Sequence, residues 1–123
     1  MDTNHSIRTV KDLKIYQLSF ELAMSVFEIS KGFPSEEKFS LTDQIRRSSR
    51  SVTANIREGF GKRHFPKSFI RHLVDALGSS EETLTWLDFA GACNYTPKNE
   101  SDNLFSQYNQ LSSMIANTIK NWK

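Results

Sequence analysis

The stretch IRHLVDALGSSEETLTWLDFAG, residues 70–91, has the spacing of a long helix that packs against other helices. Its apolar and small residues follow alternating steps of three and four, at Ile70, Leu73, Leu77, Ser80, Leu84, Leu87 and Gly91. Such steps put one side chain per turn on a single stripe, as in the seam of a helix bundle. Pro66 is acceptable in a first helical turn, so the pattern predicts a helix from there to about Cys93.

Three further segments have helical spacing, over residues 13–31, over residues 41–60, and from residue 96 or 99 towards the C-terminal end. Turn-forming residues separate the four segments. Ser40 with Asp43 three residues later predicts the N-cap of the second helix, and Gly59 with Gly61 predicts its end. Four amphipathic helices joined by short turns favour an all-α fold, an antiparallel up-down four-helix bundle.

The length and composition favour one globular domain. We expect the 123 residues to form a single domain, with a flexible polar segment over residues 1–11. The longest stretch without a polar side chain is Phe89–Cys93, far too short to span a membrane, and the N-terminal residues lack the apolar core of a signal peptide. Cys93 is the one cysteine, which excludes an intrachain disulfide and fits a reducing compartment. The sequence therefore predicts a cytoplasmic protein without a membrane partner.

Two helices carry more apolar residues than one bundle core can bury. The first helix has a second stripe that includes Phe20 and Phe27, and the third has Trp86 and Phe89 opposite its main seam. Exposed aromatic rows of this kind promote association. The pattern predicts that these four residues lie in a homo-oligomer interface; the alternative is that long loops cover them.

The sequence offers no recognisable catalytic or cofactor-binding motif. The histidines His5, His64 and His72 have no metal-ligand spacing, and Gly59-Phe60-Gly61 lacks the rest of a dinucleotide fingerprint. Cys93 lies on an apolar stripe, where a packed core residue is expected. We therefore predict a non-enzymatic protein with no metal, no cofactor and no small-molecule substrate.

Positive charge is concentrated in one segment. Residues 46–72 contain eight Lys or Arg against Glu58 alone, which gives +7, whereas the flanking segments carry −2 and −3. The eight are Arg46, Arg47, Arg50, Arg57, Lys62, Arg63, Lys67 and Arg71. A line of cations along a helix can follow a nucleic-acid backbone, which predicts RNA or DNA binding through phosphates. The alternative, weighed equally, is a solvated face or a set of arginines that bridge to a neighbouring helix or subunit.

Three polar residues near these cations have structural interpretations. Arg47 can pair with Asp43 one turn back. Asn55 lies at the edge of the apolar face, where a buried amide would fix helix register, and Glu58 is expected to pair with Lys62 or an arginine. Neither Asn55 nor Glu58 has the surroundings of a catalytic group.

The run Leu41–Arg63, LTDQIRRSSRSVTANIREGFGKR, resembles the small four-helix-bundle proteins often encoded in intervening sequences of bacterial 23S rRNA genes. Asp12-Leu13-Lys14, Phe33-Pro34 and Phe69-Ile70-Arg71 are similar to that family's pattern, whereas Thr53 and Arg57 depart from it. The resemblance implies a ring-like homo-oligomer, often a pentamer. A related branch, the accessory proteins of diversity-generating retroelements, binds nucleic acid, but the eight positions proposed above rest on their charge.

Overall fold

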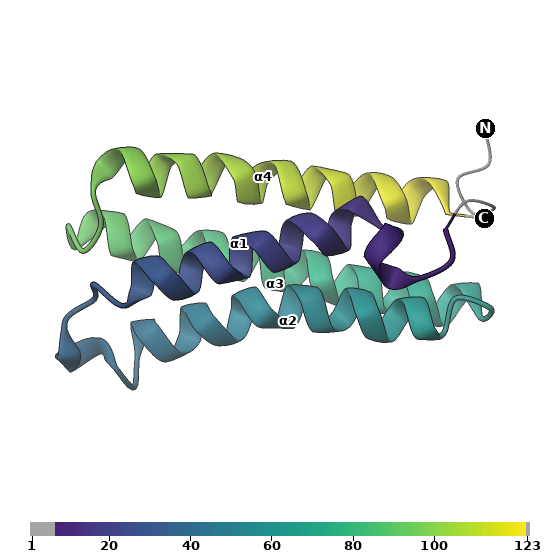
Figure 1. Ribbon diagram of the computed structural model, residues 1–123, viewed down its shortest axis with the longest axis horizontal. Coiled ribbons are helices and arrows are strands. Elements are labelled where there is room, and N and C mark those ends of the chain that lie inside the picture. Colours follow the sequence, from purple (N-terminus) through teal and green to yellow (C-terminus); the bar gives the residue numbers. More distant parts are fainter. Residues whose placement is uncertain (1–6, 123) are drawn as a thin grey trace.

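Four long helices make up the protein, as seen in a computed structural model that describes residues 7–122 (Figure 1). They are α1 (Lys14–Ser30), α2 (Leu41–Gly61), α3 (Pro66–Ala92) and α4 (Lys98–Asn121), with short 3-10 helices η2 (Val10–Asp12) and η3 (Ser35–Glu37). The long helices run side by side in alternating directions, and the described residues contain no strand. The predicted all-α up-down bundle is confirmed, and the predicted helix limits agree closely.

The core lies along the common axis of the helices. Val26 of α1, Ile45 and Val52 of α2, Leu73 of α3 and Leu111 of α4 are all completely buried. Burial of each such side chain stabilises the folded state by about 1.5–3 kcal/mol relative to an exposed one. The α2–α3 contact is the most extensive and the α1–α4 contact is the smallest among the long helices.

Small hydroxyl residues allow α2 and α3 to approach closely. Ser48 and Ser49 are buried on α2, where their small side chains leave room for a neighbouring helix. The Ser48 hydroxyl lies 2.8 Å from the Thr83 hydroxyl of α3, so these two buried polar groups form a hydrogen bond with each other. On the far side of α3, the Ser80 and Ser112 hydroxyls lie 2.8 Å apart and join α3 to α4.

The start of α2 differs from the prediction. The Ser40 side chain does not cap the helix but donates a 2.5 Å hydrogen bond to the Glu37 carboxylate. The same carboxylate accepts from the Tyr95 hydroxyl at 2.8 Å and from the Leu41 amide at 3.3 Å. These three bonds, from Ser40 first, hold the pKa of Glu37 below its usual value. Glu37, contributed by the preceding 3-10 helix, therefore takes the role predicted for Ser40.

Gly59 does not end α2, because the helix continues to Gly61. Its importance lies in packing: a Cβ atom at Gly59 would lie 2.7 Å from His72 Cβ and 2.9 Å from Phe69 Cδ1. Real side chains do not come so close. The glycine therefore allows the end of α2 to lie directly against the start of α3.

Two predictions about burial on α3 need correction. Ile70, Leu77 and Gly91 are only half-buried, whereas Phe69 and Ala90 are completely buried. Leu73, Ser80, Leu84 and Leu87 of the predicted stripe are buried, and the buried face extends beyond that stripe because α3 packs against both α2 and α4. Cys93, expected in the core, is exposed because it follows the last residue of α3.

The segment before α1 packs on the bundle from Ile7 onward, where the sequence predicted flexibility up to residue 11. Val10 is buried, and the Asp12 carboxylate accepts hydrogen bonds from the Thr9 and Arg8 amides. Those bonds, with the Arg8 charge, lower the pKa of Asp12. Burial of Val10 and the reciprocal cap between Thr9 and Asp12 stabilise this turn. The first six residues of the segment predicted to be flexible lie outside the described part of the chain.

Candidate nucleic-acid interface

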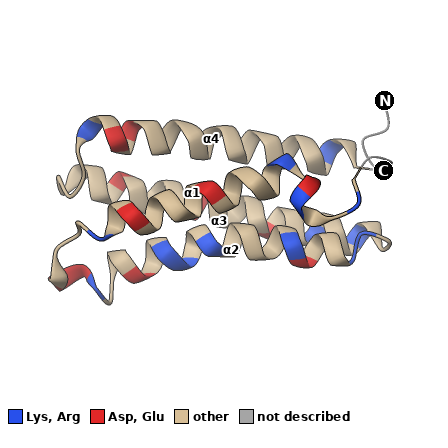
Figure 2. Ribbon diagram, in the orientation of Figure 1, with Lys and Arg blue, Asp and Glu red and all other residues tan. Residues whose placement is uncertain are grey.

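Lys and Arg residues gather along α2 and at the end of the bundle where α2 turns into α3 (Figure 2). Arg46, Arg50 and Arg57 lie on the side of α2 that faces α1, and we call these three the arginine row. Arg46 and Arg57 are eleven positions apart on the helix, or about 17 Å at 1.5 Å per residue. That length equals the rise of about five nucleotides of one B-form strand at ~3.4 Å each.

Side chains of α1 hold the arginine row in place without neutralising it. Arg46 Nε donates to the Ser30 hydroxyl at 2.8 Å, and Arg57 donates to the Tyr16 hydroxyl at 3.4 Å. The guanidinium groups of Arg46 and Arg50 lie 4.8 Å and 5.6 Å from the centre of the Phe27 ring. Aromatic and hydroxyl partners orient a guanidinium but leave its positive charge intact. Phe27, predicted at an oligomer interface, therefore lies half-buried beneath two arginines.

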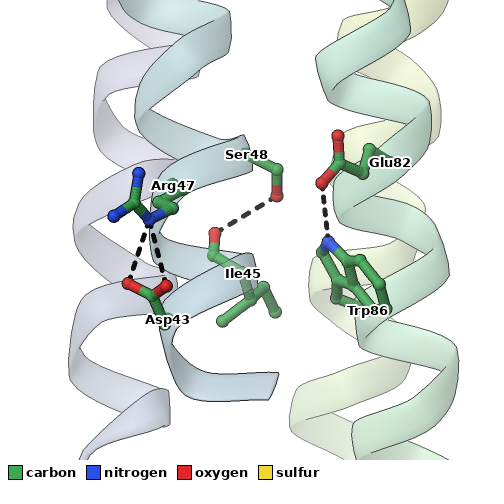
Figure 3. A network of polar contacts seen from close by, with 6 residues as sticks. All are labelled: Asp43, Ile45, Arg47, Ser48, Glu82 and Trp86. Atoms are coloured by element: carbon green, nitrogen blue, oxygen red, sulfur yellow. Dashed lines mark hydrogen bonds and ion pairs between the residues drawn. The ribbon is translucent and has the colours of Figure 1, made fainter. Parts of the chain in front are cut away.

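Arg47 points elsewhere on α2. Its Nε lies 3.0 Å from the Asp43 carboxylate, which confirms the predicted pair (Figure 3). The two side chains are 75% and 43% exposed, so the pair contributes little to stability, about 0.3–0.5 kcal/mol for such helix pairs. Its effect is mainly to offset the charge of Arg47 locally.

The turn between α2 and α3 and the first turn of α3 carry the second group of cations. We call Lys62, Arg63, His64, Phe65 and Lys67 the hairpin cluster. Arg63 donates to the Phe60 carbonyl at 3.1 Å, and its guanidinium lies 4.2 Å from the centre of the Phe60 ring. Lys67 is exposed, as is Arg71 one turn further along α3.

His72 and Asn55 connect the hairpin cluster to the helix pair. The Asn55 amide nitrogen donates to the Ser51 carbonyl at 3.0 Å, so its oxygen is free to accept from His72 Nδ1 at 3.2 Å. His72 Nε2 then accepts from the Lys62 ammonium at 3.0 Å. Asn55 is half-buried rather than buried, but it bridges α2 and α3 as a register-fixing residue would.

Glu58 does not have its predicted role. It is exposed, and in the described residues it forms no ion pair with Lys62 or with an arginine. Lys62 binds His72 instead, because the close approach at Gly59 brings α3 beside the end of α2.

The structure adds one cation, Lys11, that the sequence did not predict at this site. The 3-10 helix η2 brings Lys11 to the end of α2, where a hollow of about 430 Å³ is lined by Lys11, Arg57, Phe60, Gly61, Thr9 and Val10. Lys11 belongs to the segment with net charge −2, so the charge pattern along the sequence gave no signal for it.

Exposed apolar side chains lie beside the arginine row. Phe20 and Met24 of α1 are 52% and 48% exposed, and with Arg50 and Arg57 they line a groove of about 340 Å³ between α1 and α2. Trp86 and Phe89 lie near the C-terminal end of α3. The Trp86 and Phe89 rings are 5.9 Å apart, and the Trp86 indole donates to the Glu82 carboxylate at 3.0 Å (Figure 3).

Residues 7–122 contain no group of three or more His, Cys, Asp or Glu side chains that could hold a metal ion. Nor is any helix in this part of the chain long and apolar enough to cross a membrane.

Fold and surface together define a small four-helix bundle with a basic face and a basic end. Residues 11–117 match the family described as 23S rRNA-intervening sequence protein, and the chain belongs to this family. It is similar to a crystal structure of a protein with unknown function from the S23 ribosomal protein family of Bacteroides thetaiotaomicron. The two are 27% identical, with a TM-score of 0.78 over 87% of this chain and 96% of that chain. Among curated proteins, none matches this chain.

Proposed function

We propose that the protein binds the phosphate backbone of RNA or DNA, without catalysis and without direct reading of base edges. One observation carries this proposal. Of the eight Lys and Arg residues in the segment 46–72, only Arg47 forms an ion pair within the described chain, which leaves seven without a carboxylate partner. Clustered cations repel each other, so an anionic partner that neutralises several of them binds favourably.

The arrangement suits an extended polyanion better than a small anion. The arginine row extends for about 17 Å, and the hairpin cluster continues in the same direction at the end of α2. Each neutralised phosphate releases counterions, with a salt slope of about −0.9 per contact on duplex DNA and about −0.7 on single strands. Seven contacts predict a duplex slope of about −6, or a loss of affinity of about 10³-fold to 10⁴-fold between 50 and 200 mM salt.

The proposal includes assembly into a ring-like homo-oligomer, which the resemblance to family members first suggested. Exposed Phe20, Met24 and Phe89 support it, because large apolar side chains gain by burial between subunits. Several copies of one basic face would also raise the apparent affinity for a long strand. We place the protein in the cytoplasm, where the exposed thiol of Cys93 would stay reduced.

A second candidate is a protein–protein assembly module in which the arginines form subunit contacts and no nucleic acid binds. The groove between α1 and α2 favours it, because Arg50 and Arg57 lie beside the apolar surface of Phe20 and Met24. Arginine beside exposed aromatic groups is common at protein interfaces.

One pair of variants separates the two candidates. Arg46→Glu with Arg50→Glu reverses two charges of the arginine row. The control is Lys98→Glu, which changes a cation outside the basic segment, at the start of α4 (Figure 1). Fluorescence anisotropy with labelled RNA and DNA measures affinity from 50 to 200 mM salt, and light scattering measures the mass.

The expected outcome is a loss of affinity with unchanged mass in the double variant and little change in the control. A loss of mass would favour the assembly module. An affinity of the unchanged protein that does not vary with salt would exclude phosphate contacts as the mechanism.

A further inference from the structure

Phe65 is an exposed aromatic residue in the middle of the hairpin cluster. Its side chain is 70% exposed, and Lys62, Arg63, His64 and Lys67 all lie within three residues of it. We propose that the Phe65 ring stacks on an unpaired base, so that the hairpin cluster binds single-stranded nucleic acid in preference to duplex. This inference rests on the proposed function and adds the class of nucleic acid to it.

The backbone holds Phe65 in a defined position. Its amide donates to the Lys62 carbonyl at 2.8 Å, and its carbonyl accepts from the Ser68 amide at 2.9 Å and the Phe69 amide at 3.2 Å. The following residue, Pro66, further restricts its backbone. A ring displayed on a fixed backbone loses little conformational entropy when a ligand binds, and such preorganisation favours affinity.

Packing explains why Phe65 stays outside the core. Phe60 and Phe69 fill this end of the bundle with an edge-to-face contact at 6.3 Å, and Trp122 of the C-terminal segment packs edge-to-face on Phe69 at 4.6 Å. Phe60 is 5% exposed and Phe69 is completely buried. The core therefore has its aromatic residues in place without Phe65, whose ring remains available to a ligand.

Other exposed phenylalanines lack this combination of features. Phe39 is 87% exposed, but it lies at the other end of the bundle, where Lys38 is 5.3 Å from the centre of its ring and Glu36 and Glu37 are close in the chain. Phe20 lies against Tyr16, with ring centres 6.3 Å apart. Phe65 thus combines an exposed ring with cations on both sides of it in the chain.

This combination matches the way proteins bind single strands. Stacked aromatic side chains hold successive bases while basic side chains follow the backbone. Bases in a duplex are stacked on each other and do not reach a protruding ring. Lys62, Arg63 and Lys67 would contact the phosphates on either side of the stacked base, and because every base has a π-face, this contact tolerates any sequence.

The test compares Phe65→Ala with Phe65→Trp, which keeps an aromatic face, and with Phe39→Ala as the matched loss of an exposed ring. The probes are a labelled 12-nucleotide oligouridine, the same length of backbone without bases, and a 12-base-pair duplex. Anisotropy at 50 mM salt gives each affinity, and circular dichroism confirms that all variants keep the helical fold.

Phe65→Ala should weaken oligouridine binding by about 5-fold to 100-fold, the range found for loss of one stacked base. Binding to the duplex and to the strand without bases should change less than about 2-fold, with an unchanged salt slope. Phe65→Trp and Phe39→Ala should bind oligouridine like the unchanged protein. An equal effect of Phe65→Ala on all three probes, or no effect on oligouridine, would overturn the stacking proposal.

The two proposals fail in different ways. If the unchanged protein and the Phe65→Ala variant bind all probes with the same affinity and the same steep dependence on salt, the stacking proposal is wrong and the proposal of phosphate binding stands. If the unchanged protein binds no probe at 50 mM salt, phosphate binding is wrong and the stacking proposal fails with it.

Discussion

Replacement of Gly59 by alanine tests how closely α2 and α3 are packed. The added Cβ would lie 2.7 Å from His72 Cβ and 2.9 Å from Phe69 Cδ1, and Phe69 is completely buried. Overpacking of this kind costs about 1–3 kcal/mol. The gain in helix propensity offsets at most about 1 kcal/mol, and less near a helix end. We therefore expect Gly59→Ala to lower the free energy of unfolding by about 1–2 kcal/mol.

Gly78 provides the matched control. It lies within α3, and no atom approaches within 4 Å of its added Cβ, so Gly78→Ala should stabilise the protein by about 0.5–1 kcal/mol. Near 60 °C the entropy of unfolding is about 2.1 cal/mol/K per residue, so for this chain 1 kcal/mol corresponds to about 4 °C in Tm. The Tm and the urea midpoint, both measured by circular dichroism, should therefore fall for Gly59→Ala and rise for Gly78→Ala. Equal stabilisation by both substitutions would refute the close approach at Gly59.

Tyr108→Phe should be neutral or stabilise by up to about 1 kcal/mol at pH 7, because the buried Tyr108 hydroxyl has at most a weak contact with the Ser49 hydroxyl, which donates to the Arg46 carbonyl. Burial also raises the pKa of Tyr108, so the unfolded tyrosine ionises above pH 10 before the folded one does. In urea unfolding above pH 10, the unchanged protein should therefore lose more stability than the Tyr108→Phe variant. Ser48→Ala should lower the unfolding free energy by about 1 kcal/mol in the same assay through loss of the Thr83 contact. Glu37→Gln should lower the urea midpoint at pH 7 but not in acid, because the lowered pKa of Glu37 gives stability above pH 4.5 that is lost as the pH falls through the folded value.

Each of these expectations has a result that contradicts it. A clear loss of stability in Tyr108→Phe would show that the hydroxyl has a partner. In a double-mutant cycle of Ser48→Ala with Thr83→Val, a coupling free energy near zero would show that the Ser48–Thr83 contact does not stabilise the protein. A Glu37→Gln effect of equal size at pH 3 and pH 7 would exclude the carboxylate charge as its cause.

The amino-acid sequence was sufficient to predict the class of fold. Helical spacing depends on local geometry, so Leu73, Leu84 and Leu87 could be placed on a buried face without knowledge of their neighbours. The Arg47–Asp43 pair is likewise one turn of one helix and was predicted correctly. Predictions failed where another element determined the outcome, as with Ser40, whose capping role is taken by Glu37 with support from Tyr95.

Sequence alone determined that the chain forms four amphipathic helices and that positive charge is concentrated between residues 46 and 72, because spacing and charge are properties of the linear chain. Only the tertiary structure decided that Phe69 and Ala90 are buried on α3, that Phe27 lies beneath Arg46 and Arg50, and that Lys11 joins the end of α2. These outcomes depend on contacts between helices, whose relative rotation and distance are set by the fit of side chains from both partners. The same close packing fills the core with Phe60 and Phe69 and leaves Phe65 exposed among cations.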